Sequence, residues 1–358
     1  MADPALEKDR SVPDIKVFID SDNEPIPLEV DLDIREVIVC DYVTGAGWFC
    51  IHLSNWSADE QKFKYVDGPL IKEGAKVKIQ LGYDDNKTTL IKGEITALEP
   101  EFNVDEAPTL KAQGYDSLHR FRRGRKTKSY LKLKDSDIAR QIASNLGLSA
   151  QVEDTQVTHE YLLQNNLTDI DFLLERARRI RYELIIEDGT MHFRKAANNK
   201  EKVVTLEYGL TLQSFYPRLS TMSQVSEVLV QGWDVKTKKA IVGRARSGDA
   251  EPNPRGQQLG AGITESAFFA TKNTIIDKPI FSEGEANQIA KGKFNDMAVE
   301  FITGEGMTVG NGDIKAGNVI ELLNLGRRFS GLYYVTSATH TVGSTGYSTK
   351  FTVERNAT

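Results

Sequence analysis

The chain has 358 residues, of which 40% are hydrophobic and 27% charged, and its formal net charge is -6. This is enough apolar material for two or three domains with their own cores, and so mildly acidic a chain is not expected to wrap nucleic acid as a whole. No apolar run reaches the roughly 20 residues that cross a bilayer, and the polar N-terminus has no signal core, so neither membrane insertion nor Sec export is expected.

The first 118 residues have the pattern of a β structure. Strands are predicted at 15–19, 34–40, 48–53, 77–81 and 90–98, with turn-forming residues between them, including a hairpin turn at Asp84 to Lys87. Short strands at this spacing indicate a small barrel or sandwich. The only cysteines, Cys40 and Cys50, lie on neighbouring predicted strands. A disulfide is conceivable, but a reduced cytosolic pair packed as small hydrophobic side chains is favoured.

Helical periodicity appears after residue 118. The first helix is expected to be capped by Asp135 or Ser136 and closed by Gly147. Its apolar face consists of Ile138, Ile142 and Leu146. A short strand is predicted at 161–163. The sequence therefore predicts a small α+β module between β segments.

A second helix is expected from Thr168, its N-cap, to about Ile180, with Asp171 completing a short capping box. Most of its charged residues are expected to be solvated, namely Glu175, Arg176, Arg178, Arg179 and Arg181. Asp188-Gly189 predicts a two-residue hairpin, because both turn positions need a positive φ.

The β pattern returns at 203–206 and 225–233. Residues 246–262 hold four glycines and two prolines, which predicts a mobile loop. Ser282 and Glu285 then form a capping box for a third helix. Its expected apolar face consists of Ala286, Ile289, Ala290, Met297 and Phe301.

Two distant segments look alike. Ile71-Lys72-Glu73-Gly74 and Ile314-Lys315-Ala316-Gly317 are each followed by two predicted strands and then by a Gly-Tyr pair, at 114–115 and 346–347. A duplicated β unit would give one subunit two similar surfaces, and a ring of such subunits would carry twice as many of these surfaces as chains. This favours an adaptor in an assembly over an enzyme. Chance likeness between two short hairpins is the alternative.

The sequence offers no catalytic, metal or cofactor motif. The histidines are His52, His119, His159, His192 and His340, and no two of them lie at the i, i+4 spacing that would place both on one face of a helix. Nucleophile-elbow, phosphate-loop and dinucleotide-binding motifs are absent from the sequence. Acidic pairs such as Asp84-Asp85 and Glu99/Glu101 are expected on turns, where solvated acids are ordinary. We therefore predict no enzyme activity, no catalytic residue and no cofactor.

One basic run extends from His119 to Lys128. It could contact phosphates or an acidic partner, with Phe121 available for stacking. The favoured interpretation is a solvated or subunit-bridging strand, because the run is short, stands alone and lies at a domain junction.

Several motifs together resemble the phage late-control D family, which comprises baseplate hub proteins and the N-terminal part of the VgrG spikes of type VI secretion. They are GYDSLHR at 114–120, DSDIA at 135–139, LQNNLTD at 163–169, QGWD at 231–234, IKAG at 314–317 and RFSG at 328–331. The resemblance extends in order over nearly the whole chain.

The resemblance implies a mainly β fold with α+β insertions, in which two similar β-barrel tube domains accompany an inserted LysM-like module. The implied divisions are 1–118 (first tube barrel), 119–200 (LysM-like hub module), 201–245 (start of the second tube barrel), 246–300 (flexible loop and helix insertion) and 301–358 (completion of the second tube barrel).

The implied function is that of a structural, non-enzymatic baseplate hub. As a homotrimer it would join the hexameric inner tail tube above to the trimeric spike below, contact baseplate wedge proteins, and enclose a channel through which cargo, including nucleic acid, could pass. It would be made in the cytoplasm and belong to a phage tail or tail-like injection particle.

The alternatives are a hub-associated cell-wall-processing or peptidoglycan-binding protein, and a nucleic-acid-binding protein acting through the basic run. Because the chain stops at Thr358, just after the second implied barrel, the spike is either a separate polypeptide or part of a longer chain.

Overall fold

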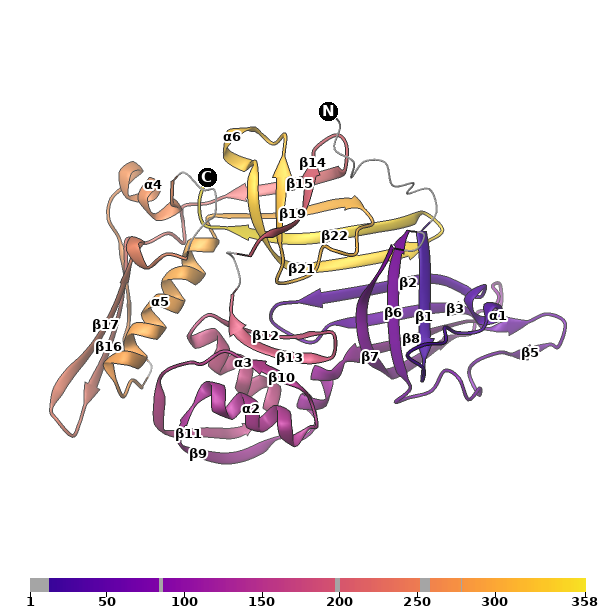
Figure 1. The fold of residues 1–358 in the computed structure, drawn as a ribbon, viewed down its shortest axis with the longest axis horizontal. Coiled ribbons are helices and arrows are strands. Elements are labelled where there is room, and N and C mark those ends of the chain that lie inside the picture. Colours follow the sequence, from indigo (N-terminus) through magenta and orange to yellow (C-terminus); the bar gives the residue numbers. More distant parts are fainter. Residues whose placement is uncertain (1–12, 84–85, 197–199, 252–257, 278) are drawn as a thin grey trace.

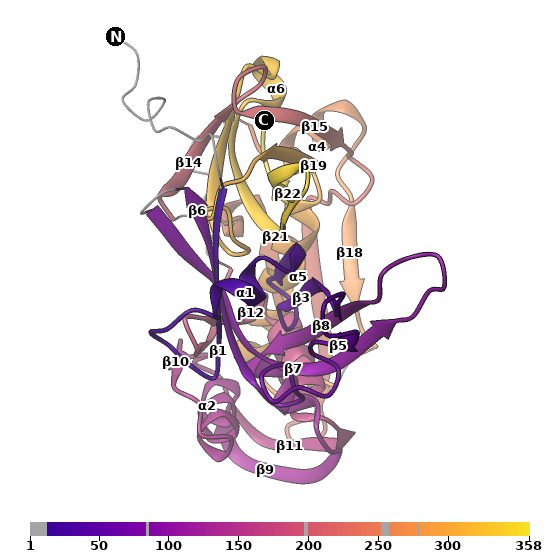
Figure 2. The same cartoon turned by 90° about the vertical axis from the view of Figure 1, so that its right-hand side faces the viewer.

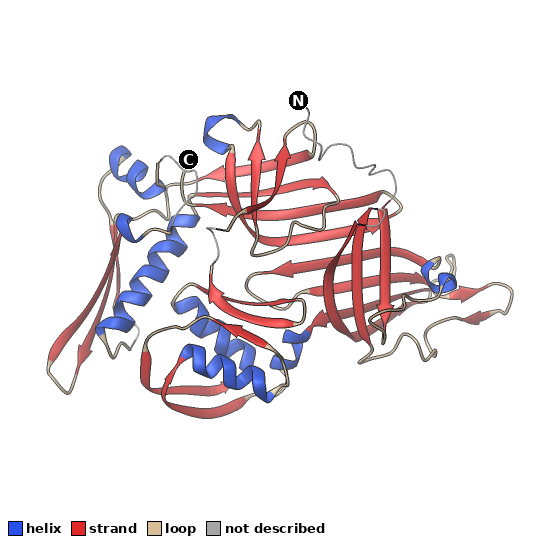
Figure 3. Cartoon of the chain, in the orientation of Figure 1, coloured by secondary structure: helices blue, strands red, loops and turns tan. Residues whose placement is uncertain are grey.

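The computed structural model describes residues 13–83, 86–196, 200–251, 258–277 and 279–358, which form a mainly β protein (Figures 1 and 3). The strands are β1 (Pro13–Ile19), β2 (Ile34–Tyr42), β3 (Trp48–Ser54), β4 (Trp56–Ser57), β5 (Lys62–Phe63), β6 (Lys76–Tyr83), β7 (Asn86–Glu101), β8 (Thr109–Asp116), β9 (Lys126–Lys134), β10 (Ala150–Val152), β11 (Thr158–Leu167), β12 (Tyr182–Glu187), β13 (Thr190–Lys195), β14 (Lys202–Glu207), β15 (Leu212–Leu219), β16 (Glu227–Asp234), β17 (Lys239–Arg246), β18 (Lys272–Ile275), β19 (Ile302–Val309), β20 (Val319–Leu323), β21 (Gly331–Gly343) and β22 (Gly346–Arg355). The α-helices are α1 (Leu28–Asp31), α2 (Asp135–Asn145), α3 (Asp169–Arg179), α4 (Gly260–Ala267), α5 (Glu283–Val299) and α6 (Gly326–Phe329).

The described residues build one twelve-stranded sheet from two sets of six strands. The first strand set runs in the order β1-β6-β7-β8-β3-β2, and the second strand set in the order β14-β20-β21-β22-β19-β15. Numbered within each set, both orders are 1-4-5-6-3-2. The two sets differ in the direction of their first strand, because β1 is antiparallel to β6 whereas β14 is parallel to β20. Antiparallel pairing of β2 with β21 joins the two sets into a continuous sheet.

Alternation of apolar and polar residues gives each strand set one buried face. In β22, for example, Tyr347, Phe351 and Val353 are buried, whereas Ser348, Lys350 and Thr352 between them face the other side and are half-buried or exposed. The first set encloses a core that includes Phe49, Ile79 and Leu110, and the second a core that includes Phe301, Ile320 and Val335. Each set thus has a core of its own, although Val342 and Tyr347 of the second set contribute to the first core.

The segment between the two sets forms a separate layer of two helices and two small sheets. Strand β11 pairs with β9, and β13 lies between β10 and β12. Helices α2 and α3 pack over a third core that includes Ile142, Leu173 and Phe193. In Figure 2 this module, with α2, β9 and β11, lies at one end of the molecule and α6 at the other.

Local signals predicted much of this module. Thr168 caps α3 by accepting a hydrogen bond from the Asp171 backbone N–H at 3.2 Å. Asp188 and Gly189 adopt φ of 50° and 82° in the β12–β13 turn. The expected cap of α2 is wrong by one residue, because Lys134 is the N-cap and Asp137 accepts from its backbone N–H. Asp135 is instead the first helical residue and is free to bind another partner.

A fourth unit lies beside the second strand set, where α5 packs on the sheet β17-β16-β18 (Figure 1). Ser282 caps α5 as expected, accepting from the Glu285 backbone N–H at 3.2 Å. The predicted loop 246–262 is wrong at its end, because Gly260 and Gly262 belong to α4 and Ala261 is buried. Residues 252–257 of that predicted loop, and Asp84 and Asp85 of the predicted hairpin turn, lie outside the described residues.

Candidate functional site

The two look-alike segments form the same turn. Gly74 and Gly317 have φ of +82° and +83°, a conformation that a β-carbon resists. The backbone N–H of Gly74 donates to Ile95 at 2.8 Å, and that of Gly317 donates to Val335 at 2.9 Å. In return, Ile95 and Val335 donate to the residues after the glycines at 3.0 and 2.9 Å. The likeness of the two Ile-Lys-x-Gly motifs is therefore a likeness of backbone structure.

Two strand irregularities coincide between the two sets, whereas the register shifts after Ile79 and Lys202 have no counterpart. A register shift follows Ile95 in the β7–β8 pairing and Val335 in the β21–β22 pairing, so these two residues correspond. A second shift follows Ile34 in the β2–β3 pairing and Leu212 in the β15–β19 pairing. Bulges bend strands at fixed places, so two shared bulges indicate two copies of one architecture.

The predicted equivalence of the two Gly-Tyr pairs is wrong. Gly114 pairs with Ile95, whereas the residue paired with Val335 is Val353. Gly346 lies instead at the β21–β22 turn, opposite Gly343. The true counterpart of Gly114 is therefore Val353, seven residues further along the chain than the motif suggests.

The β2–β21 pairing, which joins the two strand sets, occurs once within the chain. The equivalent pairing between the corresponding strands could form only with another molecule. Within the chain, β2 pairs with residues 337–342 of β21, beyond the bulge. The counterparts are β15 and residues 97–101 of β7. In the described part of the chain β15 pairs along its length only with β19, and residues 97–101 pair only with β8. Both are free sheet edges.

The two free edges carry complementary side chains. Arg218 and Tyr216 of β15 are exposed, the latter to 74%, and Glu99 and Glu101 of β7 are exposed. Both edges also contain a proline, Pro217 in β15 and Pro100 in β7. Proline lacks an N–H and is a common protection of edge strands.

The join between the two strand sets holds two carboxylates, that of the buried Asp116 and that of the half-buried Asp41, whose Oδ1 is enclosed. Asp41 accepts from the Ala316 backbone N–H at 2.7 Å, and its Oδ1 has no partner among the described residues. Asp116 accepts from the backbone N–H groups of Gly47 and Leu118 at 2.6 and 2.8 Å. Burial raises the pKa of Asp41 to about 6 and that of Asp116 to about 7. Both line a cavity of about 60 Å³ together with Lys315 of the second turn.

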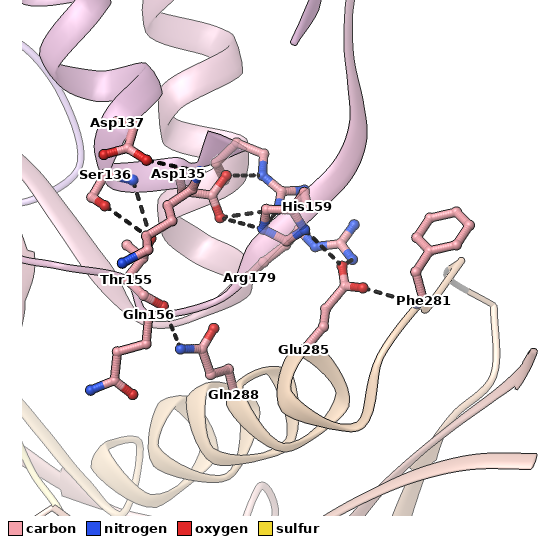
Figure 4. Close-up of polar contacts among 12 residues, drawn as sticks. Asp135, Ser136, Asp137, Thr155, Gln156, His159, Arg179, Phe281, Glu285 and Gln288 are labelled. Atoms are coloured by element: carbon pink, nitrogen blue, oxygen red, sulfur yellow. Dashed lines mark hydrogen bonds and ion pairs between the residues drawn. The ribbon is translucent and has the colours of Figure 1, made fainter. Parts of the chain in front are cut away.

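A buried ionic cluster fixes the α2–α3 module to α5 (Figure 4). Arg176 donates to Asp135 at 2.6 and 3.0 Å, and the His159 ring lies 3.2 Å from the same carboxylate. Arg179 of α3 and His159 both approach Glu285 of α5, at 3.1 and 3.8 Å. Every charge in this cluster has an opposite charge beside it, which is the pattern of a structural contact rather than of a catalytic site.

A second ionic contact centres on Arg181. Its guanidinium reaches Glu251 at 3.0 Å, Asp296 of α5 at 3.0 Å and Glu354 of β22 at 3.1 Å. The expectation that most charged residues of this region are solvated is thus wrong for Arg181 and, in α3, for Arg176 and Arg179. Their partners lie far away in the sequence, and helix periodicity carries no signal for them.

The predicted basic run is mostly engaged within the chain. Arg120 and His119 bind Glu94, and Lys126 binds Asp169 at 2.5 Å. Phe121 is buried, so the suggestion that it is available for stacking is wrong. The run therefore ties the first strand set to the α2–α3 module.

The five histidines occupy separate places, and no group of three or more His, Cys, Asp or Glu suited to a metal ion occurs among the described residues. His340, for example, is buried in the second strand set against Tyr347 and the Ile314 carbonyl oxygen, and burial lowers its pKa to about 3. Cys40 and Cys50 are free and buried. No helix in the described ranges is long and apolar enough to cross a membrane.

The fold is that of phage tail proteins. The 43 kDa tail protein of prophage MuSo2 from Shewanella oneidensis is similar at a TM-score of 0.70 and 13% identity, over 96% of this chain and 98% of that one. A tail protein from Neisseria meningitidis MC58 is similar at 0.68 and 11%, over 96% and 97%. The Escherichia coli c3393 protein, a component of the type VI secretion system, is similar at 0.60 and 10%, over 94% and 76%. The resemblance to baseplate hub proteins expected from the sequence is confirmed at the level of the fold.

The sequence itself matches the family described as "Alg8 N-terminal domain" over residues 14–344, and the chain belongs to that family. No curated protein sequence matches it.

Proposed function

We propose that the chain is a structural baseplate hub that, as a homotrimer, adapts a hexameric inner tail tube to a trimeric spike and encloses the central channel. The observation that carries this proposal is the pair of strand sets with one strand order, the same turn and the same two bulges. A chain with two similar surfaces gives a trimer six of them, which is the number that a hexameric ring presents.

The joined sheet suggests how the ring closes. If the β2–β21 join is repeated between molecules, β15 of one copy pairs with residues 97–101 of β7 in the next. Transferring the register sets Arg218 opposite Glu99 and Tyr216 opposite Glu101. The counterparts of Arg218 and Glu99 within the chain are Cys40 and Thr339, whose Sγ and Oγ1 lie 3.2 Å apart. Cross-strand neighbours of opposite charge stabilise such a pairing.

In this proposal the six-stranded sets are the two tube domains, with divisions near residues 118, 200, 245 and 300. The module between them is a LysM-like part of the hub wall. The separate cores support the divisions near residues 118, 200 and 300. Strands β16 and β17 share a core with α5, which favours an insertion that begins before Glu227 instead of near residue 245. The tube protein lies above the ring, the spike protein below it and baseplate wedge proteins around it, and cargo passes through the centre. The hub has no enzymatic role, is assembled in the cytoplasm and remains in the tail or injection particle.

A disulfide tests the ring. In the variant Arg218→Cys/Glu99→Cys, oxidation of the assembled particle should give covalent dimers and trimers of the full chain, because directly opposed strand residues have the Cα separation that a disulfide needs. Arg218→Cys alone and Glu99→Cys alone should stay monomeric on a denaturing gel. The native thiols should contribute little background, because burial raises the pKa of Cys50 to about 11 and also that of Cys40. Absence of interchain bonds in the double variant would overturn the proposed closure.

A further inference from the structure

The β7–β8 loop carries an exposed apolar tip with an acidic rim. Phe102 is 60% exposed, and Val104 is fully exposed. The Phe102 ring rests on Phe63 at 5.2 Å between centroids, so the tip has a fixed aromatic base. Asp105 and Glu106 are exposed beside Val104. We name these five residues the acidic tip.

A second exposed surface, on the second strand set, combines apolar side chains with positively charged ones. Tyr208 and Leu210, in the β14–β15 loop, are 54% and 64% exposed. Arg327 and Arg328 of α6 are exposed, and the Tyr208 backbone N–H donates to the Leu323 carbonyl oxygen at 3.2 Å, three residues before α6 begins. We name these four residues the basic patch. Apolar residues grouped with charges on a surface mark interaction sites more often than isolated ones do.

The repeated architecture indicates that these two surfaces meet. Within the chain, the β21–β22 turn lies against the start of β2: a Cβ on Gly343 would be 3.5 Å from the Arg35 carbonyl oxygen. The counterpart of this turn is the β7–β8 loop, and the counterpart of Arg35 is Gln213, the second residue of β15 after the β14–β15 loop. The same geometry between two molecules brings the acidic tip of one copy to the basic patch of the next.

We propose that the acidic tip of one molecule docks on the basic patch of a second copy, with Val104 against Leu210 and the Asp105–Glu106 pair facing Arg327 and Arg328. This inference rests on the proposed ring. The tip contact would strengthen the pairing between molecules, because Pro100 and Pro217 lie opposite each other in the transferred register. Neither proline can donate a hydrogen bond, so the strand ladder between molecules is weak at its centre. Side-chain contacts at the tip supply specificity that the ladder lacks.

The test compares two disulfides in the assembled particle. Val104→Cys/Leu210→Cys should give covalent trimers, as should Arg218→Cys/Glu99→Cys in the strand pairing. If the strand pair links and the tip pair does not, the tip contact is wrong while the ring stands. If neither pair links, the ring and the tip contact both fail. A tip cysteine that links only to a tube, spike or wedge protein would also overturn the choice of a second copy as occupant.

Charge reversal gives an independent readout. Arg327→Glu/Arg328→Glu should slow formation of the tip disulfide roughly tenfold at moderate salt, since two attractive pairs become repulsive. Adding Asp105→Arg/Glu106→Arg in the same chain should restore the rate, because complementarity returns with opposite sign. The strand disulfide should still form in all three. Equal tip rates in the three backgrounds would contradict the proposed charge pairing.

Discussion

At the scale of single residues, Arg181 holds three parts of the chain together. It follows α3, and its carboxylate partners come from the segment after β17, from α5 and from β22. Burial disfavours its charge, yet the three carboxylates together raise the pKa of its guanidinium. The pKa values of Glu251, Asp296 and Glu354 are raised by burial, which Arg181 counteracts. The four groups therefore depend on one another for their charge.

Arg181→Met should destabilise the chain by about 3–5 kcal/mol, because it leaves three carboxylates without their cation. Urea unfolding followed by circular dichroism measures the loss. Arg178→Met, at an exposed position of α3, is the matched control and should stay within about 0.5 kcal/mol of the parent. Equal effects of the two substitutions would contradict the role given to Arg181.

Asp41 should make the stability depend on pH. Its pKa in the folded chain, about 6, lies above the ordinary value of 3.8 because of burial, so the folded state binds the proton more tightly than the unfolded state. Stability is then highest below the ordinary value and falls as pH rises toward and through 6. Asp41→Asn keeps an acceptor for the Ala316 backbone N–H and removes this charge.

Asp41→Asn should therefore be more stable than the parent by about 2 kcal/mol at pH 8 and nearly equal to it at pH 4. Urea unfolding at the two pH values gives the comparison. A stability difference that is the same at both values would show that the buried charge of Asp41 is not the cause.

At the scale of the elements, signals within a few residues were readable in the sequence and distant partners were not. Thr168, Ser282 and the Asp188-Gly189 turn act locally and were predicted. The burial of Arg176 was missed because its partner Asp135 lies 41 residues away. Strand β15 was missed because Pro217 interrupts its β pattern, although an edge strand tolerates proline.

The repeated turn was found from its Ile-Lys-x-Gly motif, because the positive φ of Gly74 and Gly317 leaves a mark in the sequence. The rest of the duplication has no recognisable sequence motif, because the shared bulges follow Ile95 and Val335 and neither position requires a special residue type. The free edges could be recognised only from the strand order. That Arg218 lies opposite Glu99 follows from the strand register, and the register can be assigned only when the pairing of the whole sheet is known.

The two turns should respond alike to substitution. Gly74→Ala and Gly317→Ala should each cost about 1–2 kcal/mol, since both glycines adopt a left-handed conformation. The cost at Gly317 should be the larger, because a Cβ there would lie 3.2 Å from Arg194 Nη2, whereas the space beside Gly74 is open. Gly45→Ala, with open space and no positive φ, is the control. Thermal unfolding of the three variants would refute the equivalence of the turns if only one of the two lost stability.

At the scale of the whole molecule, the chain contains one complete join between strand sets and the two halves of another. The complete join encloses the Oδ1 atom of Asp41 and brings Val342 and Tyr347 of the second set into the core of the first. The two halves of the other join, β15 and the end of β7, are left at free edges. A closed ring satisfies both edges in every copy, whereas an unclosed repeat of the same contact would produce a filament.

The most direct test is a reconstruction of the assembled particle at a resolution that separates strands. We expect three copies of the chain around the axis, a continuous sheet through all of them, and β15 of each copy beside β7 of the next with Arg218 opposite Glu99. One, two or six copies, or three copies whose β15 edges face solvent, would contradict this expectation.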